Sequence, residues 1–234
     1  MSNPVHNDIT RSALRLARTA VGSAIYPAIA FVGAGRLDWT HGWIHAAVFI
    51  AAAVTGSLIV DRANPGLLKA RARGIGEGTK AFDKAFYLMF LPLVLIYPLL
   101  AGMDAVRFSW APLPWWTVWP GALLFLAGSA LTTWAMVVNP HAEGTVRIQN
   151  DRGHAVVTGG PYRIVRHPIY VGTVMGFPAG ALILGSAWSL VPMVLLVVLF
   201  VWRTALEDRT LRQELEGYEH YAKATRYRLV PGIW

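Results

Sequence analysis

A dense set of Arg, His, Tyr and Pro residues lies in the last third of the chain, directly before a long apolar stretch. The segment from Gly160 to Gly172 reads Gly-Pro-Tyr-Arg-Ile-Val-Arg-His-Pro-Ile-Tyr-Val-Gly. Pro168 fits the first turn of a helix, whose free N–H groups, together with Arg166 and His167, could donate to an anion. The alternative is that Arg and Tyr only anchor a helix end at the membrane interface.

A second candidate group follows the apolar stretch. Arg203 and Glu207 are four residues apart and therefore share one face of a helix, and Asp208 stands beside them. The functional interpretation is a guanidinium that binds a substrate carboxylate and a carboxylate that binds cofactor hydroxyl groups or an ammonium. The alternative is an exposed ion pair of little energetic weight, and Asp208 is given no role of its own.

The polar tail after residue 217 allows two interpretations. It contains Tyr218, Tyr221, Arg226, Tyr227 and Arg228. Such a segment could lie as an amphipathic element on anionic lipid, or it could cap a pocket. The sequence leaves both possibilities open.

Two histidines near the start of another apolar stretch have a spacing that can bind metal. His41 and His45 are four residues apart, as in helical metal and haem sites. No third ligand is visible in the sequence, and Trp39 and Trp43 beside them are typical of a membrane interface. We therefore predict no metal site.

Composition determines the class of protein. Of the 234 residues, 55% are hydrophobic and 15% are charged, against about 25% charged in soluble domains. The chain is thus predicted to be an all-α integral membrane protein, with Met1 as the native start and the first apolar span retained. It has no cysteine, which excludes disulfides and a thiolate nucleophile. The net charge of +8 lies in short segments between spans, which argues against a nucleic-acid partner.

About six membrane crossings are expected, with a helical hairpin as the last pair. Residues 169–202 would form a helix of about 50 Å, too long for a hydrocarbon core of about 30 Å. Gly185-Ser186-Ala187 lies at the middle and is predicted to turn the chain between two helices of about sixteen residues. Residues 1–138 then form a four-span region and residues 139–234 a catalytic region of one structural domain. The expected spans are Thr19–Gly35, Trp43–Val60, Ala85–Gly102, Trp116–Val138 and the hairpin Ile169–Trp202.

Charge predicts the orientation of these spans. With both termini in the cytoplasm, 19 of the 21 Lys and Arg residues lie inside, and only Arg36 and Arg107 lie outside. This arrangement brings residues 139–168 and 203–234 to the same cytoplasmic face. We therefore expect a pocket at that face, where the hairpin opens.

The chain resembles the isoprenylcysteine carboxyl methyltransferase family, in its bacterial branch. The resemblance covers residues 139–234, and the connector with Asn64-Pro65, Lys80 and Asp83 is more weakly similar. The residues that carry it are Gln149, His154 to Val157, Gly160 to Tyr162, Arg166 to Tyr170, Arg203, Glu207, Asp208, Leu211, Tyr218 and Tyr221.

The resemblance implies a membrane enzyme, in the bacterial inner membrane, that uses S-adenosylmethionine and binds no metal. It assigns Arg203 to a lipidic methyl acceptor that enters from the bilayer, and makes Arg203 and Glu207 the catalytic pair. The residues implied to bind the cofactor are Gln149, His154, Ala155, Val156, Val157, Tyr162, His167, Pro168, Ile169, Tyr170 and Glu207.

The leading hypothesis is methyl transfer to a carboxylate of an isoprenylcysteine-like lipid. One rival hypothesis is a phospholipid amine N-methyltransferase, which needs a base such as Glu207 because an amine must lose a proton. A second rival is a sterol-type reductase that uses a nicotinamide nucleotide, and a third is a non-enzymatic transporter or assembly factor. A transporter predicts charge at mid-membrane, and the spans carry almost none.

Overall fold

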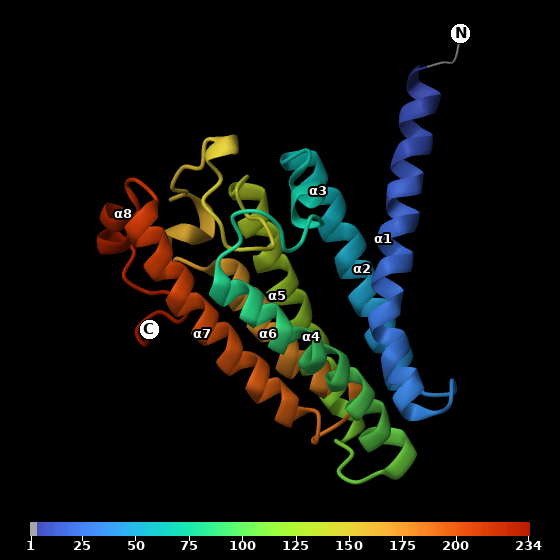
Figure 1. Cartoon of the computed structure of the whole chain (residues 1–234). Coiled ribbons are helices and arrows are strands. Elements are labelled where there is room, and N and C mark those ends of the chain that lie inside the picture. The colour runs from blue at the N-terminus through green and yellow to red at the C-terminus, as the bar shows by residue number, and fades with distance from the viewer. Residues whose placement is uncertain (1–3) are drawn as a thin grey trace.

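The protein is a bundle of long helices whose polar connections gather at one end (Figure 1). The computed structural model describes the backbone of residues 4–234 and the side chains from Thr19 onward. The predictions for Met1, Arg11, Arg15 and Arg18 therefore lie outside the described residues. Within this part of the chain there is no strand, which confirms the all-α class.

In the described part of the chain, six helices form the bundle and two short ones lie at its polar end. The long helices are α1 (Pro4–Ala34), α2 (Thr40–Ala63), α4 (Ala81–Gly102), α5 (Val118–Val138), α6 (Pro168–Leu184) and α7 (Leu190–Glu214). The short helices are α3 (Leu67–Arg71) and α8 (Tyr218–Ala224). Single turns lie at η1 (Met103–Phe108), η2 (Trp115–Thr117), η3 (Asn150–Arg152) and η4 (Gly160–Arg163).

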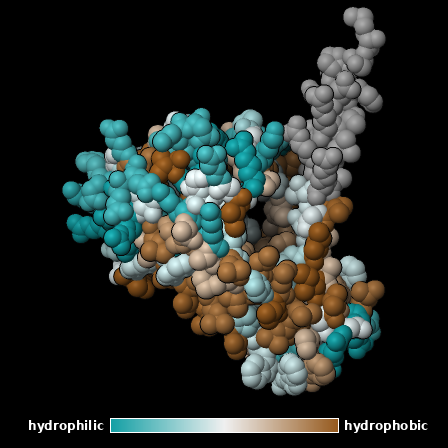
Figure 2. All heavy atoms as spheres, viewed as in Figure 1, coloured by the Kyte–Doolittle hydropathy of each residue, from teal (hydrophilic) through white to brown (hydrophobic). Residues whose placement is uncertain are grey.

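The apolar helices agree with the expected membrane crossings. Four helical stretches are long and apolar enough to span, Thr40–Ala63, Ala81–Phe108, Trp115–Val138 and Leu190–Glu214, and Thr19–Ala34 and Pro168–Leu184 are shorter apolar helices. The third span is longer than predicted because the π-helical turn η1 continues α4. Figure 2 shows a hydrophobic belt over the bundle and hydrophilic residues at the end that carries α3 and α8.

The C-terminal hairpin is confirmed, with one difference in length. α6 ends at Gly185, whose φ of 74° suits a residue without a Cβ. Asp104 holds the turn, because its carboxylate accepts the Ser186 hydroxyl at 2.7 Å and the Trp188 N–H at 3.0 Å. α6 has 17 residues, near the expected sixteen, but α7 has 25 and continues past the apolar stretch. The longer α7 carries Arg203, Glu207 and Asp208 to the polar end.

α5 and α6 approach each other closely because small residues face each other. A Cβ added to Gly172 would lie 2.3 Å from the Gly128 carbonyl oxygen, and one added to Gly128 would lie 2.6 Å from the Gly172 carbonyl oxygen. No side chain fits either position. The close contact places the segment that leaves α5 at Asn139 beside the segment that enters α6 at Pro168, and those two segments build the candidate site.

Candidate functional site

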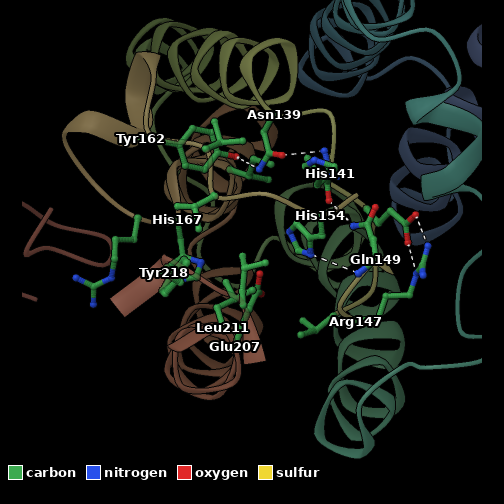
Figure 3. A pocket seen from close by; sticks show the side chains of 18 of the residues that line it. Asn139, His141, Arg147, Gln149, His154, Tyr162, His167, Glu207, Leu211 and Tyr218 are labelled. Carbon is green, nitrogen blue, oxygen red and sulfur yellow. Dashed lines mark hydrogen bonds and ion pairs between the residues drawn. The ribbon is translucent and has the colours of Figure 1, made fainter. Parts of the chain in front are cut away.

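A pocket opens at the polar end of the bundle, between the segment 139–170 and helices α7 and α8 (Figure 3). In Figure 3, Arg147, Gln149 and His154 lie on one side, with Glu207 and Tyr218 across from them. Eleven residues that the sequence assigned to cofactor or acceptor line it together: Gln149, His154, Ala155, Val156, Val157, Tyr162, His167, Ile169, Tyr170, Arg203 and Glu207.

Pro168, which was also assigned to the cofactor, is not among the lining residues. It is buried as the first residue of α6. The free N–H groups expected in that turn are partly used, because the Tyr170 N–H donates to the His167 carbonyl at 3.0 Å and the Val171 N–H at 3.2 Å. Binding of an anion at this turn stays a prediction.

Asp208 is the centre of a buried charge network that the sequence interpretation overlooked. Its carboxylate is fully buried and accepts from Arg166 at 2.6 and 3.0 Å. It also accepts from Arg228 at 2.9 Å, from Tyr218 at 3.1 Å and from Arg212 at 3.2 Å. A buried carboxylate needs this many donors, because desolvation of an unpaired charge is costly. Asp208 therefore ties the entry of α6, α7, α8 and the tail together.

This network also changes the interpretation of Arg166 and His167. Arg166 was expected to bind an anion or to anchor at headgroups, but its guanidinium is bound by Asp208 and by the carbonyls of Thr225 and Arg226, the two carbonyls each at 2.7 Å. His167 Nε2 lies 3.4 Å from Asp208 Oδ1. Both residues still line the pocket, but Arg166 is neutralised before any ligand arrives.

Arg203 is held by helix α4 and by the segment after α5. Its Nε lies 2.7 Å from Asp83 Oδ1 in an ion pair that does not meet hydrogen-bond geometry, and its Nη2 donates to the Gly144 carbonyl at 2.7 Å. Asp83 in turn accepts the Val146 N–H at 2.8 Å. The guanidinium also lies over the Phe86 ring, 4.4 Å from its centroid. The alternative interpretation, an exposed ion pair of Arg203 with Glu207, is therefore wrong, because a fully buried acid on another helix pairs with Arg203.

Glu207 remains available to a ligand on the same face of α7. Its carboxylate accepts the hydroxyl of Tyr170, and the Tyr170 ring stacks on His167 with centroids 5.7 Å apart. A neutral hydroxyl donor does not cancel the carboxylate charge, so Glu207 presents a negative group to the pocket.

Arg71 supplies a positive group that the sequence interpretation did not assign. It reaches the pocket from α3, and its Nη1 donates to the carbonyls of Ala142 and Glu143, the latter at 3.1 Å. Among the described residues no acid lies within ion-pair distance of it. Arg71 and Arg203 both contact the chain between residues 142 and 144. Asp83 balances the charge of Arg203, so Arg71 makes this the cationic side of the pocket, and Glu207 supplies an anionic group.

Gln149 is placed by a compact set of hydrogen bonds on the opposite wall. Its amide donates to the His141 carbonyl at 2.6 Å, and its backbone N–H donates to His154 Nδ1 at 3.4 Å. Arg152 donates to the Gln149 side-chain oxygen at 3.0 Å. The His141 and His154 rings are 4.8 Å apart, and the buried His141 Nδ1 has no partner in the described part of the chain. A ligand with a donor or acceptor could satisfy that nitrogen.

The tail acts as a cap, which decides between its two interpretations. Tyr218 and Tyr221 are buried and line the pocket. The Tyr221 hydroxyl donates to the Tyr162 carbonyl at 2.7 Å, and the backbone N–H of His167 donates to the Arg228 carbonyl at 3.0 Å. Residues 218–228 therefore pack on the site.

We expect acidification to destabilise the fold through His154. Burial, with repulsion from His141, lowers the pKa of His154 to about 4. The unfolded chain binds a proton near pH 6.5, so the stability from neutral His154 is complete above that pH and is lost as the pH falls toward 4. The melting temperature of the purified protein should therefore fall between pH 7.5 and 5.0, and His154→Gln should show a smaller fall. Equal falls in both proteins would contradict a partly buried, neutral His154.

Comparison with known families agrees with a membrane methyltransferase. The model of the phospholipid methyltransferase family matches residues 116–216. This segment holds α5, the Gln149 and His154 wall, the α6–α7 hairpin and Glu207, which is most of the pocket but less than half of the chain. No curated protein matches the chain.

The matched segment omits several residues that the structure brings to the site. Arg71 and Asp83 come from the connector and α4, and Tyr218 and Tyr221 come from α8. The weak resemblance at the connector was the signal that could have pointed to Asp83. Arg71 and His141 carried no motif that distinguishes them from ordinary interfacial residues.

Proposed function

We propose that the protein is a membrane S-adenosylmethionine-dependent methyltransferase that methylates a carboxylate of a lipidic acceptor. The observation that carries this proposal is one pocket, at the polar end of the bundle, that has an unneutralised Glu207 and a cationic side at Arg71, with the Asp83-paired guanidinium of Arg203 beside it. The match to a methyltransferase family over residues 116–216 supports the reaction class.

The charges of the pocket fit a cationic methyl donor. S-adenosylmethionine supplies a methyl group on a sulfonium, and its ammonium and ribose hydroxyls are groups that a carboxylate binds. Glu207 would take that part. Val156, Val157 and Leu211 offer an apolar wall for the adenine, and the unpartnered Nδ1 of His141 offers a polar contact. The residues present therefore fit the cofactor chemically.

The cationic side fits an anionic acceptor. A carboxylate is ionised at pH 7, with a pKa near 4, so transfer to it requires no base. What the protein must provide is alignment and exclusion of water. Arg203 keeps its positive charge at pH 7. Its two contacts, with Asp83 and the Gly144 carbonyl, fix the plane of its guanidinium. The buried cap residues Tyr218 and Tyr221 shield the site from water.

The name of the matched family favours a second candidate, a phospholipid amine N-methyltransferase. An amine acceptor must lose a proton, and Glu207, the base that this candidate needs, lines the pocket. The cationic side weighs against this candidate, because an amine near Arg71 would be repelled while it is protonated.

Calorimetry with S-adenosylhomocysteine tests the cofactor site in detergent-purified protein. We expect binding by the wild type, loss of at least about tenfold in affinity in Glu207→Ala, and little change in Arg203→Lys, which keeps a cation opposite the buried Asp83. Tenfold corresponds to about 1.4 kcal/mol, which is within the range of one charged hydrogen bond. Glu214→Ala, on the same helix but in an exposed ion pair with Lys80, is the matched control. Absence of binding by the wild type would refute the cofactor assignment.

A further inference from the structure

A second cavity of about 340 Å³ lies within the membrane part of the bundle, between α1, α2, α4, α5 and α6. This volume is in the range of small-molecule sites. Its wall is mostly apolar and contains many small residues. At Gly176, an added Cβ would meet only a Phe125 ring atom, at 3.9 Å, so the backbone there borders open space.

One buried polar group in this wall has no partner. His45 is 2% exposed and lines the cavity, and its Nδ1 makes no hydrogen bond to any described residue. Its ring lies among aromatic rings, 6.2 Å from Tyr26 and 5.9 Å from Phe49. Buried polar groups normally have a partner, and an unpaired one is unfavourable. A ligand group that pairs with Nδ1 would account for this histidine.

The cavity is distinct from the candidate methyl-transfer site. His45 lies in the second turn of α2, and Ser57, another wall residue, lies twelve residues further on, a helical rise of about 18 Å toward the polar end. At that end, Leu68 and Met136 line the cavity, and they belong with Ile169 to one apolar cluster around Val60, Leu67 and Ala142. Ile169 lines the candidate site on its other side. One apolar layer therefore separates the two.

We propose that this cavity binds a membrane-borne, single-chain apolar molecule that carries a hydroxyl group, and that this hydroxyl pairs with Nδ1 of His45. The apolar wall and the position within the spans require a ligand that partitions into the bilayer. A charged group at this depth would be too costly. A hydroxyl both donates and accepts, so it pairs with either tautomer of a neutral histidine. The proposal does not depend on the methyltransferase assignment.

Two probes that differ by one hydroxyl test the proposal: 1-dodecanol and dodecane. Each probe competes with tritiated 1-dodecanol for binding to the detergent-purified full chain. Affinities are compared by the concentration of each probe within the detergent micelles. The wild type should bind the alcohol at least about tenfold more tightly than the alkane, as one buried hydrogen bond requires. His45→Leu should abolish this preference, and Gly176→Leu should abolish binding of both probes by filling the cavity.

His41→Leu is the matched control, because His41 lies on the same helix, four residues from His45, but does not line the cavity. It should keep the preference for the alcohol. Equal affinity of the wild type for the two probes, or no binding of either, would overturn the proposal, as would a preference that survives His45→Leu. A thermal melt reports folding of each variant. If His45→Leu does not fold, the wild-type comparison and Gly176→Leu still decide the outcome.

Discussion

Asp208→Asn is expected to lower the melting temperature of the protein by roughly 10 °C and to abolish S-adenosylhomocysteine binding. Asp208 is fully buried and joins Arg166, Tyr218 and Arg228, which come from three separate segments. The asparagine keeps the size of the side chain but removes its charge. Arg166, itself 4% exposed, would then be a buried cation without a counter-ion. Loss of one partner of a buried pair costs about 3–5 kcal/mol.

The measurement is a thermal melt in detergent, followed by calorimetry on the fraction that stays folded. Asp151→Asn is the matched control, because Asp151 also pairs with an arginine, Arg147, but is exposed. It should melt close to the wild type. A melt of Asp208→Asn within about 2 °C of the wild type would show that the network around Asp208 is not what holds the site together.

Arg203→Lys should reduce turnover at least about 100-fold and leave S-adenosylhomocysteine affinity nearly unchanged. A lysine keeps the charge, but a compact ammonium cannot contact Asp83 and the Gly144 carbonyl in the fixed plane of a guanidinium. The acceptor carboxylate would then lose its alignment, and small misplacements in a site cost about this much in rate. The assay is transfer of a tritiated methyl group to N-acetyl-S-farnesylcysteine.

Arg209→Lys is the control for this variant, since Arg209 lies on the same helix and is exposed. Its turnover should equal that of the wild type. Near-normal turnover of Arg203→Lys would show that Arg203 only joins α4 to α7 and does not align the acceptor. Methyl transfer to phosphatidylethanolamine but not to the farnesylcysteine would instead select the amine acceptor and reject the carboxylate.

The sequence predicted the parts of the site that depend on order along the chain. The hairpin turn at Gly185 followed from the length of the apolar stretch, and the shared face of segments 139–168 and 203–234 followed from the positions of Arg and Lys. Both predictions use limits that a membrane sets on each local stretch of sequence: the length of a span and the side on which positive charge lies. The pocket that contains Gln149, His167 and Glu207 is the direct result.

The sequence could not predict which charges pair. The four-residue spacing of Arg203 and Glu207 indicated a pair on one helix, but Asp83, from another helix, is paired with Arg203. A fully buried carboxylate cannot do without a cation, whereas Glu207, which is only partly buried, needs only the Tyr170 hydroxyl. For the same reason Asp208, which resembled a spare acid next to Glu207, is the centre of a network. Which charged side chains pair depends on how deeply each is buried, and the spacing of residues along the chain does not give that depth.

The convergence on Asp208 has a consequence for how the protein is made. Arg166, at the entry of α6, meets its counter-ion only when α7 has been inserted, and Arg228 joins them from the chain beyond α8. During synthesis, the helices made before α7 and α8 therefore cannot complete the pocket by themselves. The pocket should therefore become complete in one step, when the segment that carries Arg228 joins Asp208, rather than gradually as each span emerges.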